Sequence, residues 1–185
     1  MLIVFHNFKV KRWIIDAQNK LGSKLELQPT LQEKKLAFNS YKFISQDVNA
    51  HKVILLQLKE SLKSMPDDES NCMINNMIES YDKLYEDVED RAKVTEKHVA
   101  NHEAYQQTFD NMRDWISTIV NETSVLMNDL TIDRESAKSS INVIESILNQ
   151  KEEGDHLIED CNQQLNIILE QTSIPGIILT FMYFF

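Results

Sequence analysis

Two histidines, His98 and His102, have the spacing in this sequence that comes nearest to a chemical site. Four residues apart on a helix, both imidazoles would share one face and could bind zinc if a third ligand arrived. The pair lacks the glutamate of an H-E-x-x-H motif, so we expect no metal there. His51 falls on an apolar helical face, and we predict a core histidine that faces a neighbouring helix.

The other reactive side chains form no catalytic pattern either. The chain has 29 Asp and Glu residues, but no motif places two of them in a cleft for acid–base chemistry. Its 3 glycines are scattered and cannot form a phosphate-binding loop. Cys72 and Cys161 lie far apart and are predicted to be free thiols in a reducing compartment. We therefore predict no catalytic, cofactor-binding or metal-binding residue, and no enzyme.

Charge excludes a further class of partner. Across 185 residues, 19 Lys and Arg stand against 29 Asp and Glu, which gives a formal net charge of −10. Binding to a phosphate backbone needs a basic patch, so we expect no nucleic-acid partner. The length suits one compact domain or two small ones in series.

The elements that carry these residues are predicted to be long helices. With only 3 Gly and 3 Pro, the chain falls well below the usual roughly 7% and 5%. Because these residues mark turns, few turns are expected. The stretch from Asp67 to Glu153 contains neither of them and is rich in Glu, Asp, Lys, Met and Asn. The predicted fold class is all-α.

A first helix is predicted from about Thr30 to Met65. Pro29 precedes it, and Thr30 is a candidate N-cap with Glu33 three residues later. Its apolar positions advance alternately by three and four residues, as in a coiled-coil seam. They are Tyr41, Ile44, Val48, His51, Leu55, Leu58, Leu62 and Met65.

A second, much longer helix follows the same spacing from Ile74 to Leu130. Counting both ends it has 130 − 74 + 1 = 57 residues, or about 85 Å at 1.5 Å per residue. Its seam is most polar in the middle, at Arg91, Thr95, His98 and His102. A polar middle between apolar ends suits a helix that leaves one bundle and enters the next.

The third helical segment is less regular and starts near Asp133, a candidate N-cap. Its seam is predicted to include Ile141, Ile144, Leu148, Leu157, Ile158, Cys161, Leu165, Ile168 and Leu169. Gly154 within it costs about 1 kcal/mol relative to alanine and is predicted to mark a bend or weak point.

The segment after this helix, Gly176–Phe185, is uniformly apolar but only ten residues long. A membrane-spanning helix needs about 20 residues, so we expect no transmembrane segment. Two interpretations remain. The segment could associate with a membrane surface, or it could fold back onto the exposed apolar face of the second unit. We favour the second, because ten residues bury too little in lipid to anchor alone.

The two tryptophans indicate a repeat. Trp13 and Trp115 are 115 − 13 = 102 residues apart, and this offset maps the helix start near Thr30 onto Ile132. A period of this length exceeds the short solenoid repeats and fits a three-helix bundle joined to its neighbour. Each Trp is expected on the first helix of its bundle, packed inward.

This pattern resembles the spectrin repeat over about Phe8 to Ile174. The residues that carry the resemblance are Trp13, MRDWI around Trp115 with Phe109 before it, Phe43–His51, Tyr81–Leu84 and Glu89–Arg91. The family implies a three-helix bundle whose third helix runs unbroken into the next repeat. The domains implied are residues 1–98 as one repeat, 99–174 as a partial two-helix repeat and 175–185 as an apolar tail.

Within that family, Ser146–Gly176 resembles repeats of the nesprins, which link the outer nuclear membrane to the cytoskeleton. Dystrophin, spectrin and spectraplakin are the alternative branches. The sequence departs from the pattern at IILTFMYFF, where a further amphipathic helix should begin. Two helices alone would leave an apolar groove uncovered, so Ile144, Leu148, Leu165 and Leu169 are predicted to be only partly buried.

The resemblance implies a non-catalytic spacer and interaction segment of a cytoskeletal linker between the nuclear envelope and actin. It implies a location at the cytoskeleton or outer nuclear envelope, in the cytoplasm. The partners implied are other helical proteins or neighbouring repeats, and self-association. Actin and membrane contacts would come from calponin-homology domains and an anchor elsewhere in a parent protein. The alternative is a membrane-associated helical protein that uses its apolar C-terminal tail.

Overall fold

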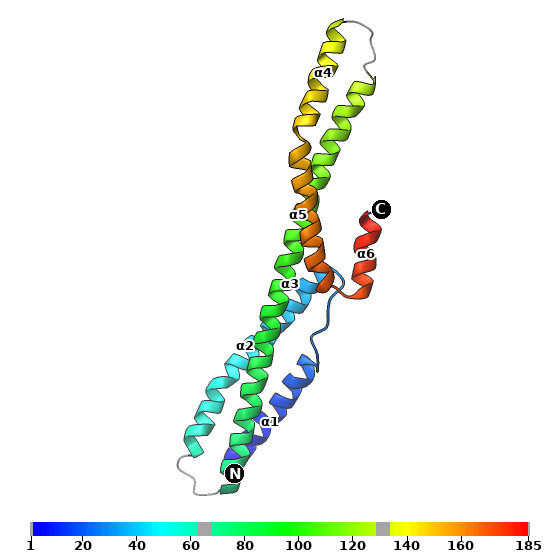
Figure 1. Ribbon diagram of the computed structural model, residues 1–185. Coiled ribbons are helices and arrows are strands. Elements are labelled where there is room, and N and C mark those ends of the chain that lie inside the picture. The colour runs from blue at the N-terminus through cyan, green and yellow to red at the C-terminus, as the bar shows by residue number, and fades with distance from the viewer. Residues whose placement is uncertain (1, 63–67, 129–133, 185) are drawn as a thin grey trace. The chain divides into compact units, whose positions relative to one another are not determined.

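The computed structural model describes residues 2–62, 68–128 and 134–184. All regular structure within these ranges is α-helical, which confirms the predicted fold class (Figure 1). The helices are α1 (Leu2–Leu21), α2 (Leu31–Leu62), α3 (Asp68–Asn128), α4 (Arg134–Asn149), α5 (Lys151–Glu170) and α6 (Ile174–Phe184).

The chain divides into two compact units. The first comprises Met1–Val99 with Ser173–Phe185, and the second comprises Ala100–Thr172. The long helix α3 belongs to both, because it continues unbroken through residue 99. Its 61 residues extend the predicted helix at the N-terminal end, where it starts at Asp68 rather than near Ile74.

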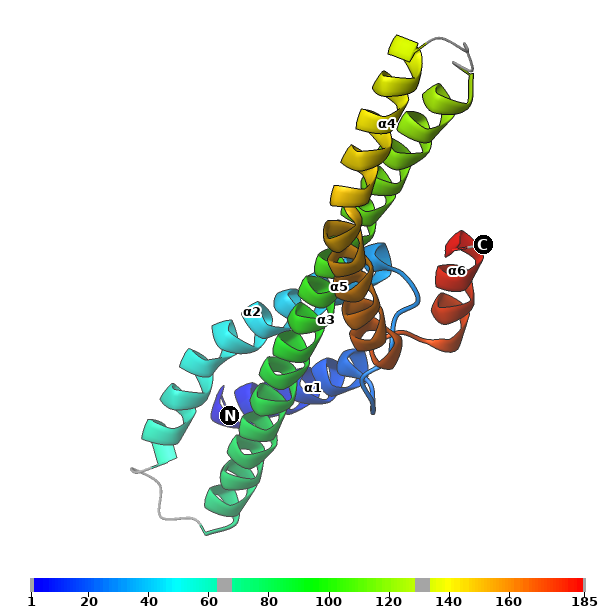
Figure 2. The same ribbon diagram turned by 45° about the horizontal axis from the view of Figure 1, so that its top comes forward.

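The core of the first unit is formed by α1, α2 and the N-terminal part of α3, a three-helix bundle (Figures 1 and 2). On α2 the predicted seam residues Ile44, Val48 and Leu55 are buried. The full buried apolar set is Val10, Ile14, Ala17, Leu21, Ile44, Val48, Leu55, Ile74, Met77, Tyr81, Leu84 and Val88.

Local sequence explains where α1 ends and α2 begins. Gly22 has φ of 71°, the left-handed conformation that commonly closes a helix. Arg91 of α3 donates to the carbonyl oxygens of Leu21 at 2.7 Å and of Gly22 at 3.0 Å, which satisfies acceptors that a helix end leaves open. The amide of Glu33 donates to Thr30 Oγ1 at 3.2 Å, and that hydroxyl donates to Glu33 Oε2 at 2.8 Å. The predicted cap at Thr30 is confirmed.

Trp13 packs inward as predicted, and His51 is its partner. The two rings stack with centroids 3.8 Å apart and an interplanar angle of 11°. Trp13 Nε1 donates to Asp47 Oδ2 at 3.0 Å, and His51 Nδ1 lies 2.9 Å from the carbonyl oxygen of Asp47. His51 is therefore a hydrogen-bonded histidine that faces α1, as predicted.

The second unit is a pair of antiparallel helices, the C-terminal part of α3 against α4 and α5. Asn101 Nδ2 donates to Gln171 Oε1 at 3.1 Å near one end, and Trp115 meets Gly154 further along. Between α4 and α5 stands Gln150, whose φ of −85° and ψ of −3° are close to helical. Its amide lies 3.3 Å from the carbonyl oxygen of Ser146, so α5 continues the course of α4.

Gly154 does not mark the break that the sequence suggested. It lies inside α5 and is buried, and the irregularity occurs one turn earlier, at Gln150. A Cβ at position 154 would stand 2.3 Å from Cη2 and Cζ2 of Trp115. Only glycine fits at this position, because the indole ring of Trp115 occupies the space that a side chain would need. The predicted N-cap Asp133 lies outside the described residues.

The apolar C-terminal segment forms α6, and Pro175 stands in its first turn, where the missing N–H is tolerated. The amide of Ile177 donates to the carbonyl oxygen of Ser173 at 3.0 Å. Among the described helices, none combines the length and apolarity needed to cross a membrane. The expectation that this segment covers the second unit was wrong, because Ser173–Phe185 belongs to the first compact unit.

Candidate interaction surface

The two histidines of α3 are both half-buried. Over the described parts of the chain, no group of three His, Cys, Asp or Glu residues could hold a metal ion. Burial lowers the pKa of His98, and the charges of Lys34 and Lys97 lower it further, so the imidazole is neutral. The His102 ring lies edge-on to Tyr105 with centroids 6.1 Å apart.

Lys34, in the first turn of α2, is a buried cation that the sequence prediction missed. Only 1% of the residue is exposed, and burial lowers the pKa of its ammonium from 10.5 to about 8. The sequence could have predicted this burial, because Lys34 is seven residues before Tyr41 and so falls on the same apolar seam of the helix.

The two thiols differ in environment. Cys72 is exposed and Cys161 is buried. Burial raises the pKa of the Cys161 thiol, with a hydrogen bond from Thr108 acting the other way. Burial also raises the pKa of Tyr105 to about 12, helped by Cys161. Both groups are protonated at neutral pH, so Cys161 is a packing residue and no nucleophile.

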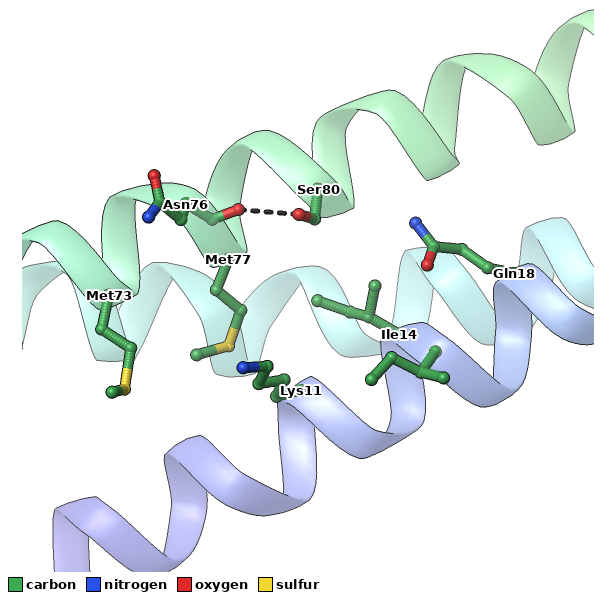
Figure 3. Close-up of a pocket in the computed structure, with 8 residues that line it drawn as sticks. Lys11, Ile14, Gln18, Met73, Asn76, Met77 and Ser80 are labelled. Atoms are coloured by element: carbon green, nitrogen blue, oxygen red, sulfur yellow. Dashed lines mark hydrogen bonds between the residues drawn. The ribbon is translucent and has the colours of Figure 1, made fainter.

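A cavity of about 290 Å³ opens between α1 and α3 (Figure 3). Ile14 and Met77 supply apolar surface, and Lys11 is the charged group of its lining. Ser80 donates its hydroxyl hydrogen to the backbone carbonyl oxygen of Asn76 at 2.8 Å, so this hydroxyl is used within α3. Such a mixture is typical of a gap between packed helices, and it lacks the converging polar groups of a ligand site.

A row of exposed apolar residues lies on the second unit. None of the residues of α4 is buried. Along α4 and α5, the half-buried or buried residues that face α3 recur by three and four: Val143, Ile147, Gln150, Gly154, Leu157 and Cys161. The residues one position later, together with Ile141 one turn before them, form a second row, which we call the outer seam. On it Ile141, Ile144, Leu148 and Ile158 are exposed by 42–64%.

The outer seam confirms the prediction of an incompletely covered second unit. Leu165 and Leu169 are half-buried, and Ile144 and Leu148 are more exposed than "partly buried" implied. The predicted third seam was wrong in one respect, because it combined residues of the inward-facing row with residues of the outer seam. Leu157, Cys161 and Ile168 face α3, whereas Ile141, Ile144 and Leu148 do not.

Helix α3 extends this apolar face. Successive residues stand about 100° apart around a helix, so Ile116 and Val120 lie about 100° and 140° from the inward-facing Trp115. Ile144 and Leu148 lie about 60° and 100° from Ile147 in the same sense. The two helices run antiparallel. Residues displaced in the same rotational direction from the contact line therefore lie on the same side of the helix pair. Ile116 and Val120, 42% and 55% exposed, therefore adjoin the outer seam.

Comparison with known proteins gives one informative relationship. No family model matches the chain, and no solved structure matches it. The chain is 33% identical over 168 residues, 91% of its length, to a segment of the "Muscle-specific protein 300 kDa" of Drosophila melanogaster. It spans about 1% of that relative, which is a far longer protein.

Proposed function

We propose that this chain is a non-catalytic structural spacer and protein-interaction segment of a nesprin-like cytoskeletal linker built from spectrin-type repeats. The observation that carries the proposal is helix α3, which passes from the first compact unit into the second without interruption. The similarity along 91% of the chain to a segment of a very long muscle protein supports it.

The middle of α3 is suited to act as a continuous connection. Thr95 is buried, and its hydroxyl donates to the carbonyl oxygen of Arg91 at 2.7 Å. This polar seam position is therefore satisfied within the helix, and Arg91 is satisfied by the carbonyl oxygens at the end of α1. At a rise of 1.5 Å per residue, the 61 residues have a contour length of about 90 Å. A spacer needs this property, and an enzyme of this size does not.

The finer part of the proposal concerns the parent protein and its place in the cell. The resemblance of Ser146–Gly176 to nesprin repeats favours a linker between the nuclear envelope and the actin cytoskeleton. The spacer would then act at the cytoskeleton or the outer nuclear envelope. Contacts with actin and membrane would be made by other parts of the parent protein.

A distance measurement across α3 tests the spacer. Cys72 is exposed, and Ser117→Cys adds a second exposed labelling site 45 residues along the same helix, with Cys161→Ala removing the third thiol. A continuous helix predicts spin labels or dyes about 68 Å apart. A broad or much shorter distribution would contradict a continuous spacer.

A second candidate function, membrane association through α6, is favoured by the exposure of Ile174, Ile178 and Leu179. Sedimentation with liposomes, with and without residues 176–185, separates the two functions. Binding that disappears with the tail supports membrane association, and equal sedimentation of both chains excludes it.

A further inference from the structure

The negative charge of the chain is confined to the second compact unit. Between Ala100 and Thr172 there are 4 Lys and Arg residues and 14 Asp and Glu residues, so this unit has a formal charge of 4 − 14 = −10. The first unit has 15 residues of each sign and is neutral overall. A partner that is attracted by charge is therefore drawn to the second unit.

Part of this charge forms a regular row beside the outer seam. Glu145, Glu152 and Glu159 stand seven residues apart, each one position after a residue of the outer seam, and all three are exposed. We call them the glutamate row. Seven residues make almost two helical turns, so the three carboxylates line one edge of the seam over 14 residues, or about 21 Å. Lys138, seven residues before Glu145, ends this edge with the opposite sign.

The second unit does not neutralise the glutamate row. No ion pair recorded among the described residues involves any of its three carboxylates, and Glu159 accepts one hydrogen bond, from Gln163 Nε2 at 3.5 Å. The base Arg113 of α3 is already paired, with Asp110 at 2.9 Å and Asp114 at 3.4 Å. Bases that match the row have to come from another molecule.

The surface beside the row is an apolar strip with the period of a helix. The exposed isoleucines and leucine of the outer seam adjoin Ile116 and Val120 of α3, on helices that lie side by side (Figures 1 and 2). Apolar residues that recur by three and four along such a strip fit the apolar face of one further helix. Lys151 and Asp155 stand near its middle, one turn apart, and together add no net charge.

We propose that this face binds an amphipathic helix of another protein that carries Lys or Arg at every seventh position. Its apolar side lies on the outer seam and Ile116, and its basic side chains pair with the glutamate row. The apolar contact supplies most of the affinity. The charges select the partner and speed its association, because pairs at the edge of a contact stay hydrated and are individually weak.

This inference deepens the proposed function and rests on it in one respect, that the second unit is an interaction segment. The probe is a synthetic three-heptad peptide with Leu at its contact positions and Lys at every seventh flanking position. Fluorescence anisotropy of the labelled peptide with the full chain should show saturable one-to-one binding. A peptide with Glu in place of each Lys, and a scrambled peptide of the same composition, should each bind at least about tenfold more weakly.

Two double variants of the chain locate the contact. Glu152→Lys with Glu159→Lys reverses two charges of the glutamate row and should raise the dissociation constant of the Lys peptide at least about tenfold. Glu153→Lys with Asp160→Lys is the matched control. It makes the same change of charge at exposed positions one residue along, but each precedes an inward-facing residue and so lies on the other side of α5. This control should bind the Lys peptide almost as well as the natural chain does.

Exchanging the charges on both sides is the decisive step. The peptide with Glu at the flanking positions should bind the Glu152→Lys, Glu159→Lys chain about as tightly as the Lys peptide binds the natural chain. Circular dichroism of each variant checks that the helices are retained, which is expected because the altered side chains are exposed.

Four results would overturn the inference. The first is the absence of saturable binding, and the second is equal weakening by both double variants, which would mean attraction by net charge alone. The third is a charge exchange that does not restore binding. The fourth is a chain that dimerises and thereby excludes the peptide, which would assign the face to a second copy. The labelled distance across α3 keeps the two proposals apart, because a chain with labels about 68 Å apart that binds no peptide retains the spacer and loses only this docking site.

Discussion

The two tryptophans have different surroundings in the two compact units. Trp13 stacks on His51 and donates its indole hydrogen to Asp47, inside a bundle of three helices. Trp115 lies against Gly154 in a helix pair, and its Nε1 is buried with no hydrogen-bond partner among the described residues. In the first unit α2 supplies the polar partner of the tryptophan, whereas the helix pair of the second unit supplies none among the described residues.

The difference extends to the apolar seams. In the first unit, α2 buries Ile44, Val48 and Leu55. In the second, no residue of α4 is buried, and the burial of α5 is limited to Gly154, Cys161 and Ile168. Burial of apolar surface is the main stabilising contribution to folding. We therefore expect the first unit to be the more stable of the two.

Truncating the tryptophans should give the largest effects and is the direct test of this comparison. Trp13→Ala removes a stacked ring and leaves the Asp47 carboxylate without its donor. Removal of a large aromatic core residue costs about 3–5 kcal/mol of unfolding free energy. Trp115→Ala should cost less, because its indole nitrogen has no hydrogen-bond partner to lose among the described residues. Urea unfolding followed by circular dichroism measures both, and equal losses would show that the second unit is as well enclosed as the first.

A break in α3, the helix shared by both units, tests whether that helix is a single rigid connection. Val99→Pro, at the boundary between them, removes a backbone hydrogen bond and should cost about 3 kcal/mol or more. The labelled distance across α3 should then shorten or broaden. Val99→Ala is the control, since it keeps the backbone hydrogen bond. An unchanged distance in the proline variant would mean that α3 is not a single rigid connection.

The sequence predicted much of the first unit because its signals were periodic and local. The alternation of three and four residues identified the α2 seam, and Thr30 with Glu33 identified its start. Gly154 shows where this reasoning fails. Helix propensity treats a glycine as a weak point and carries no information about a ring that approaches from another helix. Trp115 and Gly154 are 39 residues apart in the chain, so only the antiparallel register of α3 and α5 brings them together.

Filling the space at Gly154 should destabilise the second unit by about 1–3 kcal/mol, the usual cost of overpacking. Alanine improves helix propensity by up to about 1 kcal/mol, but its Cβ would stand 2.3 Å from the Trp115 ring. A smaller side chain at 115 relieves this conflict, so Trp115→Leu should make Gly154→Ala neutral or stabilising. A double-mutant cycle measures the coupling, and additive effects would mean that the ring does not occupy this space.

The smallest expected effect lies in the first unit and concerns Lys34. Its pKa in the folded chain is about 8, below the ordinary 10.5. Below pH 8 the ammonium group is charged in both the folded and the unfolded chain, and its burial disfavours the fold there. Between pH 8 and 10.5 the unfolded chain binds more protons than the folded chain, so stability rises with pH in that window.

Lys34→Met should remove this cost while keeping the volume of the side chain. We expect the variant to be more stable than the natural chain by about 1–2 kcal/mol below pH 8, with a gain that shrinks toward pH 10.5. The contributions of other groups that titrate in this range, such as Tyr81 and Tyr105, cancel when the unfolding free energies of the two chains are subtracted. Lys59→Met, at an exposed position of α2, should show no such trend. A gain that stays constant with pH would mean that Lys34 is stabilised as a cation, and that the first unit owes part of its greater stability to this charge.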